Sequence, residues 1–153
     1  MEITTGSARF GLWFVQIRWS GTVVYQVRFS RTAIAGPVPV LIRQYLAGRQ
    51  VDLTALASGT LAPGEAYARI YWEVRNIPYG ETATYGEIAE QARTVPRVVG
   101  QALRRNPVPL IVPCHRVVSR SGLGGFTPDP EIKVLLLNME RKATLGSMGK
   151  KST

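Results

Sequence analysis

Residues 84–107 read TYGEIAEQARTVPRVVGQALRRNP and predict two short helices joined by a small turn. Thr84 and Glu87 have the spacing of a capping box, so we expect the first helix to begin at this point. Thr94 can cap the second helix, and Asn106-Pro107 would end it. Two short helices so close together are typical of a helix-turn-helix unit.

The second helix of this unit has an apolar side and a basic side. The apolar positions, which we expect to be buried, are Val95, Val98, Val99, Ala102 and Leu103. The opposite side carries Arg97, Gln101 and Arg104 at i, i+4 and i+7, with Arg105 beside them. A basic stripe on a second helix suits contact with nucleic acid, although a solvated helix face has the same pattern.

Upstream of this unit, the chain first has the two-residue alternation of β-strands. Apolar residues alternate from Phe10 to Phe29 around Ser20-Gly21, which predicts a β-hairpin whose inward residues are Val15, Ile17, Trp19, Val23, Tyr25, Val27 and Phe29. Residues 37–48 have helical spacing, with Tyr45 among the apolar residues expected to pack on the hairpin. The glycine and proline residues of 57–64 indicate a boundary between two lobes. A further helix is expected from Tyr67 to Ile77.

Downstream, the glycine-rich segment from Ser119 to Phe126 suggests a β-ribbon or wing. Asp129-Pro130 is a good start for a last helix, whose expected buried residues are Ile132, Leu135, Leu136 and Met139. The fold class is therefore α/β (α+β). A small N-terminal lobe of sheet and helix, residues 1–63, precedes a winged helix-turn-helix lobe, residues 64–146, and we expect 147–153 to be a frayed tail.

Composition limits the classes of function. The 153 residues are 45% hydrophobic, enough for one domain or two small ones, and the formal net charge of +9 favours a polyanionic partner such as nucleic acid. A single cysteine forms neither an intramolecular disulfide nor a Cys-rich zinc site, and we expect no metal and no cofactor. The sequence has no signal peptide and no apolar run near ~20 residues, so we expect an intracellular protein, cytoplasmic or nuclear, with no membrane contact.

The only cysteine, Cys114, precedes the only histidine, His115, within the segment Ile111–Val118. A thiol is a good nucleophile only as thiolate, and His115, Arg116 and the basic surroundings could lower the pKa of Cys114. Neighbouring side chains on a strand point to opposite sides, so a link between the two requires a turn or a bridging water. A core cysteine beside a histidine has the same local sequence.

The wider context resembles the O6-alkylguanine-DNA alkyltransferases. Asn106-Pro107-Val108-Pro109 followed by Ile111–Val118 is similar to the active-site signature of that family. Other motifs follow in the family's order across residues 65–141: Ile77-Pro78-Tyr79-Gly80-Glu81-Thr82, Thr84-Tyr85-Gly86, Arg97-Val98-Val99-Gly100, Gly122-Leu123-Gly124-Gly125-Phe126, and Lys133-Val134-Leu135-Leu136 with Glu140.

The resemblance implies a monomeric protein that binds double-stranded DNA in the minor groove, flips out O6-alkylguanine and moves the alkyl group irreversibly to Cys114. His115 would be the base, acting through a water and oriented by Glu140. Asn106 would brace the turn, and Tyr85 would donate a proton to the departing base.

The resemblance also implies roles for residues that contact DNA or the flipped base. Arg97 would enter the duplex in place of the flipped nucleotide, and the other DNA-contacting residues would be Thr84, Gly100, Gln101, Arg104 and Arg105. In the base pocket, backbone groups of Cys114, Val117 and Thr127 would read the edge of the guanine. Phe126 would line the pocket, and Pro113 would also belong to it.

The chain departs from the family pattern at three places. Phe126 stands where a tyrosine is frequent, Pro96 and Val98 are larger than the residues usual on the groove-facing helix, and the turn before Arg97 is short. Two other functions fit part of the sequence. An alkyltransferase-like protein that only binds the lesion would lack Cys114, and a DNA-binding regulator would leave Cys114, His115, Asn106 and Glu140 unexplained.

Overall fold

The computed structural model describes the backbone of residues 2–151 and the side chains of residues 2–146. The strands are β1 (Thr4–Phe10), β2 (Trp13–Ser20), β3 (Val23–Ser30), β4 (Ala83–Thr84) and β5 (Val117–Val118). The α-helices are α1 (Val40–Leu46), α2 (Ala68–Arg75), α3 (Tyr85–Gln91), α4 (Pro96–Arg104) and α5 (Pro130–Lys151). Single 3-10 turns, η1 (Leu53–Ala55), η2 (Gly59–Leu61) and η3 (Cys114–Arg116), lie in the connections.

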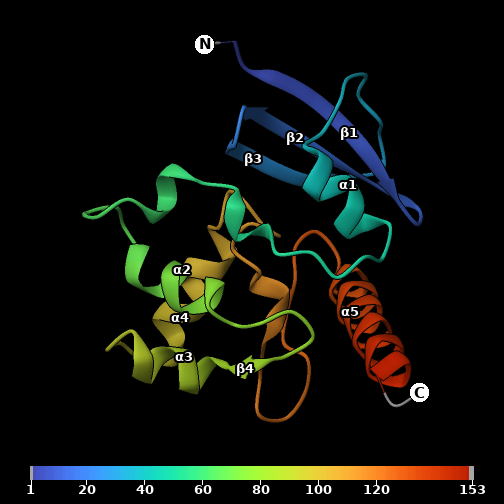
Figure 1. Cartoon of the computed structure of the whole chain (residues 1–153). Helices are drawn as coiled ribbons and strands as arrows, with labels where there is room; N and C mark the ends of the chain where they lie inside the picture. Colours follow the sequence, from blue (N-terminus) through green and yellow to red (C-terminus); the bar gives the residue numbers. More distant parts are fainter. Residues whose placement is uncertain (1, 152–153) are drawn as a thin grey trace.

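Figure 1 shows two lobes, a sheet with α1 against it and a group formed by α2, α3 and α4, with the segment that precedes α5 running between them. The sheet is antiparallel in the order β1-β2-β3. The expected α/β class, a small sheet lobe followed by a helix-turn-helix lobe, is confirmed. No helix in the described part of the chain is long and apolar enough to cross a membrane.

The hairpin of β2 and β3 is confirmed, but two of its inward residues, Val23 and Tyr25, were predicted wrongly, because Val24 stands opposite Trp19. Trp19 pairs with Val24 while Arg18 pairs with Gln26, so Tyr25 is the extra residue of a β-bulge. Tyr25 is 43% exposed, and Val24 is buried in its place. Strand β1 was not predicted, because its sequence TTGSARF has no apolar alternation.

The helix-turn-helix unit forms as expected, with one correction at the start of α4. The capping box of α3 is present: the Glu87 N–H donates to Thr84 Oγ1 over 3.1 Å, and the Thr84 N–H donates to Glu87 Oε1 over 3.0 Å. Thr94 does not cap α4, and Val95 is 56% exposed rather than buried. Pro96 is the reason, since it holds Val95 in an extended conformation and so makes Pro96 the first helical residue.

The glycine-rich segment does not form the expected β-ribbon. Beyond β5, which pairs in parallel with β4, the described chain has only one bridge, between Ser119 and Gly122. Residues 122–125 are exposed, and with three glycines they have few side chains to pack against a partner strand. The segment is therefore a turn followed by a loop that leads to α5.

Helix α5 begins as predicted, with the Glu131 N–H donating to Asp129 Oδ1 over 2.9 Å. Its buried face differs from the expected one, because Leu135 is 36% exposed while the Lys133 side chain is buried. Ile132, Leu136 and the polar pair Lys133 and Glu140 point inward. The helical backbone continues to Lys151, and residues 152–153 of the expected tail lie outside the described residues.

Candidate active site

The segment around Cys114 forms a tight turn instead of a strand. Cys114 to Arg116 make a 3-10 turn, in which the Arg116 N–H donates to the Pro113 carbonyl over 2.9 Å. Asn106 braces the chain that enters it: its Nδ2 donates to the Val112 carbonyl over 3.0 Å, and its Oδ1 accepts from the Val108 N–H over 3.0 Å. The turn removes the strand alternation that would have sent Cys114 and His115 to opposite faces.

Cys114 is buried at the inner end of a cavity of about 490 Å³. Burial raises the pKa of its thiol, while a hydrogen bond from Asn106 and the charge of Lys133 act in the opposite direction. Burial dominates, so the resting side chain is a thiol and nucleophilic chemistry at neutral pH needs a base. The described structure has no direct hydrogen bond between the thiol and the His115 ring.

His115 is buried and joined to a carboxylate through one ring nitrogen. Its Nε2 lies 2.6 Å from Glu140 Oε2, whereas Nδ1 is buried and has no hydrogen-bond partner among the described residues. Burial lowers the pKa of His115, which makes the neutral imidazole the resting form. The proton then belongs on Nε2, facing the carboxylate, and the lone pair of Nδ1 is free to accept another.

Glu140 accepts hydrogen bonds from four residues. Oε1 accepts from Arg116 Nε over 2.9 Å and from the Gly80 N–H over 3.0 Å. Oε2 accepts from His115, from Arg116 Nη2 over 3.1 Å, and from the Tyr45 hydroxyl. Burial alone would raise the pKa of Glu140, but the hydrogen bonds and charges of His115 and Arg116 outweigh it and hold the pKa well below its usual range.

The cation that acts on Cys114 is Lys133, not Arg116 as the sequence suggested. Arg116 is turned to Glu140 and to the Ile77 carbonyl, which its Nη1 contacts over 2.9 Å. Lys133 comes from α5, and its Nζ donates to the Val117 carbonyl over 2.6 Å. Burial lowers the pKa of Lys133 to about 8, so it carries much of its charge at neutral pH.

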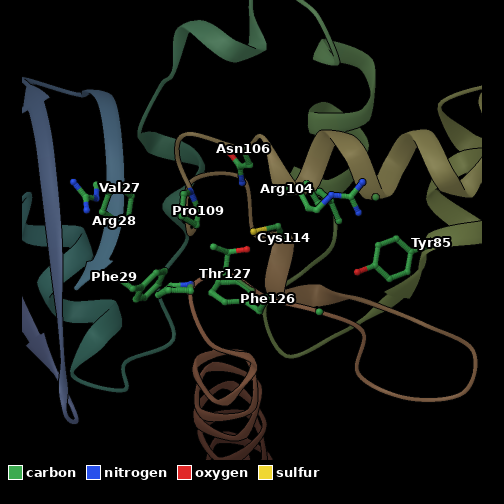
Figure 2. Close-up of a pocket in the computed structure, with 14 residues that line it drawn as sticks. Val27, Arg28, Phe29, Tyr85, Arg104, Asn106, Pro109, Cys114, Phe126 and Thr127 are labelled. Atoms are coloured by element: carbon green, nitrogen blue, oxygen red, sulfur yellow. The ribbon is translucent and has the colours of Figure 1, made fainter. Parts of the chain in front are cut away.

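Tyr85 faces the same cavity from the first residue of α3. Figure 2 shows its hydroxyl directed into the pocket toward Cys114. Burial, followed by the nearby Cys114, raises the pKa of Tyr85 and keeps it a donor. Gly124, at φ +77°, packs against this ring, and a Cβ there would lie 2.9 Å from the Tyr85 hydroxyl oxygen.

The cavity has walls from both lobes (Figure 2). Phe126 and Thr127, two of the residues expected to form the base pocket, line it, and Phe29 of β3 meets Phe126 edge-on, with ring centroids 5.6 Å apart. The other two predicted pocket residues do not line it. Pro113 borders a different cavity, on the other side of the turn, and Val117 is buried with its carbonyl bound by Lys133.

The residues expected to contact DNA lie on or next to α4, except Thr84, which lies at the start of α3. Gly100 and Arg104 line the cavity, and Arg97 is exposed one turn before Gly100. Gln101 is half-buried, and Arg105 is exposed, with its Nη1 bonded to the Tyr67 hydroxyl over 2.9 Å. The Thr84 hydroxyl accepts the capping hydrogen bond of α3.

Sequence reasoning missed two of the polar groups in this site, Tyr45 and Lys133. Lys133 could have been found, because it stands seven residues before Glu140 and so on the same face of one helix. The role of Tyr45 had no local signal. Among the described residues, no three His, Cys, Asp or Glu side chains are grouped as metal ligands.

Comparison with known proteins identifies a family for the C-terminal half of the chain. Residues 65–142 match the family model described as 6-O-methylguanine DNA methyltransferase, DNA binding domain. A methylated-DNA–protein-cysteine methyltransferase of Sulfolobus acidocaldarius is 54% identical over 72 residues, 47% of this chain and 46% of the relative. The relative of the same name from Methanopyrus kandleri is 60% identical over 67 residues, 44% of this chain and 51% of that one. The match thus spans about half the length of these curated relatives.

Solved structures extend the similarity to both lobes. The O6-methylguanine methyltransferase of Mycobacterium tuberculosis has a TM-score of 0.74 at 28% identity, covering 93% of this chain and 94% of that one. A structure of the Mycobacterium tuberculosis OGT in complex with DNA has a TM-score of 0.73 at 29% identity, covering 91% and 93% of the two chains.

Proposed function

This chain belongs to the 6-O-methylguanine DNA methyltransferase family, and from that premise we propose that it repairs O6-alkylguanine in double-stranded DNA by moving the alkyl group to its own Cys114. It would act as a methylated-DNA–protein-cysteine methyltransferase. The observation that carries the proposal is that the only cysteine lines a cavity with walls from both lobes and lies next in the chain to a neutral histidine bound to a carboxylate.

The reaction balances as an in-line displacement. The Cys114 thiol gives its proton to Nδ1 of His115 through a bridging water, and the thiolate attacks the alkyl carbon. A C–S bond forms as the C–O bond to guanine breaks, and the bond electrons leave with the base. The departing guanine takes up a proton, for which we assign Tyr85 as donor.

Each molecule would act once. The product is a thioether, and the site as described offers Cys114 no second nucleophile that could displace it. Glu140 would orient His115 without taking the proton, since its very low pKa makes it a poor base. Asn106 would keep the turn in place.

Binding of duplex DNA through α4 would account for the net positive charge of the chain, and flipping of the nucleotide would account for a thiol that lies inside a cavity. An alkyl carbon inside a base stack cannot reach Cys114, so the nucleotide must leave the duplex. We propose that α4 lies in the minor groove, that Arg97 replaces the flipped nucleotide, and that Thr84, Gly100, Gln101, Arg104 and Arg105 contact the strands. The protein would act as a monomer on genomic DNA, at the nucleoid or in the nucleus.

Mass spectrometry tests the proposal directly. After incubation with a duplex containing O6-methylguanine, the peptide that holds Cys114 should gain the mass of one methyl group, and Cys114→Ala should abolish the gain. An unmodified peptide would contradict the proposal. Tight lesion binding without a mass change would instead indicate a binding protein, and equal affinity for undamaged DNA would indicate a regulator.

A further inference from the structure

Tyr45 joins the N-terminal lobe to the histidine and carboxylate of the candidate active site. It lies in α1, which packs with the sheet, and its side chain is 0% exposed. Its hydroxyl donates to Glu140 Oε2 and lies 3.2 Å from His115 Nε2. These contacts cross 95 and 70 residues of sequence.

The direction of these hydrogen bonds follows from proton counting. Burial and the negative charge of Glu140 raise the pKa of Tyr45 well above its usual value, so the hydroxyl keeps its proton. It has one proton to donate, and the carboxylate accepts it. Towards His115, the tyrosine oxygen can then act only as an acceptor. Two acceptor oxygens, that of Tyr45 and Oε2 of Glu140, therefore face Nε2 and favour a proton on that nitrogen.

From this geometry we infer that Tyr45 is a positioning residue for alkyl transfer: its hydroxyl fixes Glu140 and holds His115 in the Nε2–H form, leaving Nδ1 as the proton acceptor. The inference rests on the proposed function for its kinetic consequences, but the state of the imidazole is testable without it. It also gives the N-terminal lobe a part in the chemistry.

The hydroxyl should also affect the pH dependence of transfer. The groups that face His115 are Glu140 and Lys133 from α5, Tyr45 from α1, and Arg116 and Cys114 from its own turn. Removing the tyrosine proton donor leaves more of the Glu140 charge to attract a proton to His115. The imidazolium form of His115 is then favoured. As the pH is lowered, the rate of transfer should therefore begin to fall at a higher pH than in wild type.

The chain offers a clear spectroscopic readout, because His115 is its only histidine. We would compare wild type, Tyr45→Phe and Tyr71→Phe by long-range ¹H–¹⁵N spectra of labelled histidine. Tyr71 is the matched control, since it is also buried and its hydroxyl donates one hydrogen bond, to the Ala102 carbonyl over 2.7 Å. Wild type and Tyr71→Phe should show the neutral Nε2–H form down to the same pH, whereas Tyr45→Phe should convert to the imidazolium form at a higher pH.

Single-turnover kinetics complete the test. We expect Tyr45→Phe to slow transfer by about five- to tenfold, the scale of one typical intramolecular hydrogen bond, and to move the acid limb of the rate profile to higher pH. Duplex affinity should stay unchanged. Site-specific 3,5-difluorotyrosine at position 45, a stronger donor that keeps the side chain, should move the acid limb to lower pH and serves if Tyr45→Phe does not fold.

The outcomes separate this inference from the proposed function. A wild-type imidazole titration and a wild-type pH profile of transfer in the folded Tyr45→Phe and difluorotyrosine proteins would overturn the role of Tyr45, even if transfer to Cys114 occurs. Absence of transfer in wild type would overturn the proposed function, while the comparison of imidazole titrations would still decide the role of Tyr45. If Tyr71→Phe changed the imidazole signals and the pH profile as much as Tyr45→Phe, the effect would be one of lost stability, and the inference would be overturned.

Discussion

Lys133 and Glu140 stand two turns apart on the buried face of α5, and each serves a different member of the Cys114–His115 pair. Lys133 lowers the pKa of the thiol by its charge, and Glu140 holds the imidazole through Nε2. The helix thus delivers one positive and one negative group to opposite ends of the proposed proton transfer.

Replacing Lys133 with methionine should leave the thiol harder to ionise. The loss of a positive charge removes one of the influences that lower the pKa of Cys114, and we expect transfer at neutral pH to slow by about tenfold, which corresponds to ~1.4 kcal/mol in the barrier. Raising the pH should restore part of the rate. Measurement of the single-turnover rate against pH checks this, with Lys142→Met, an exposed lysine of the same helix, as control. An unshifted profile would show that Lys133 has no effect on the thiol.

Arg116 should matter more for stability than for the thiol. Its guanidinium is buried and paired with Glu140. Arg116→Leu therefore removes the positive charge and two hydrogen bonds that stabilise the buried carboxylate. Breaking a buried ion pair by removing one partner costs about 3–5 kcal/mol. Because the folded-state pKa of Glu140 is depressed, its stabilising contribution is present above its unfolded pKa and is lost as pH falls toward its folded value. Urea denaturation of wild type should therefore show stability falling on acidification below about pH 4.3, the unfolded glutamate value, and Arg116→Leu should flatten that dependence.

Local sequence patterns predicted the elements whose causes are local. The capping box of α3 depends on residues three apart, and it forms as expected. The start of α4 was misplaced because the proline constraint at Pro96 outweighed the capping tendency of Thr94. The face of Tyr25 could not be read from alternation, since a β-bulge opposite Arg18 and Trp19 shifts the register.

The candidate site depends on contacts between segments that lie far apart in the sequence. Only those site residues that belong to a family motif could be predicted. Resemblance to a family brought together Cys114, His115, Glu140 and Asn106. The structure places Cys114 and His115 on one turn, Glu140 on the helix beside it, and Asn106 against the chain that enters the turn. Tyr45 and Phe29 reach the site only through packing of one lobe on the other. No periodicity or spacing in the sequence near either residue predicts that packing.

Gly124 should be required for Tyr85 to keep its place. A methyl group at Gly124 would meet the Tyr85 hydroxyl oxygen at 2.9 Å and would sit at φ +77°, which an L-residue rarely adopts. We expect Gly124→Ala to cut transfer by about tenfold, by displacing the proposed proton donor. Gly125→Ala is the control, because nothing lies within 4 Å of its Cβ position and its φ is not in that strained range. Equal rates for the two variants would argue against a role for the Tyr85 position.

Arg97 should be needed for flipping the nucleotide and not for the chemistry. Its side chain is exposed on α4 and does not line the cavity at Cys114, so its removal leaves the thiol and its partners untouched. We expect Arg97→Ala to slow repair of O6-methylguanine in duplex DNA by at least about tenfold, since a flipped nucleotide without a replacement in the stack costs a few kcal/mol. Transfer from the free base O6-benzylguanine needs no flipping and should proceed at the wild-type rate.

Arg69→Ala, which removes an exposed arginine from α2, controls for the loss of one positive charge and should leave both rates close to wild type. Equal losses on both substrates would assign Arg97 to the active site instead, and wild-type rates on both would remove it from the reaction, so the ratio of the two rates decides where this residue acts.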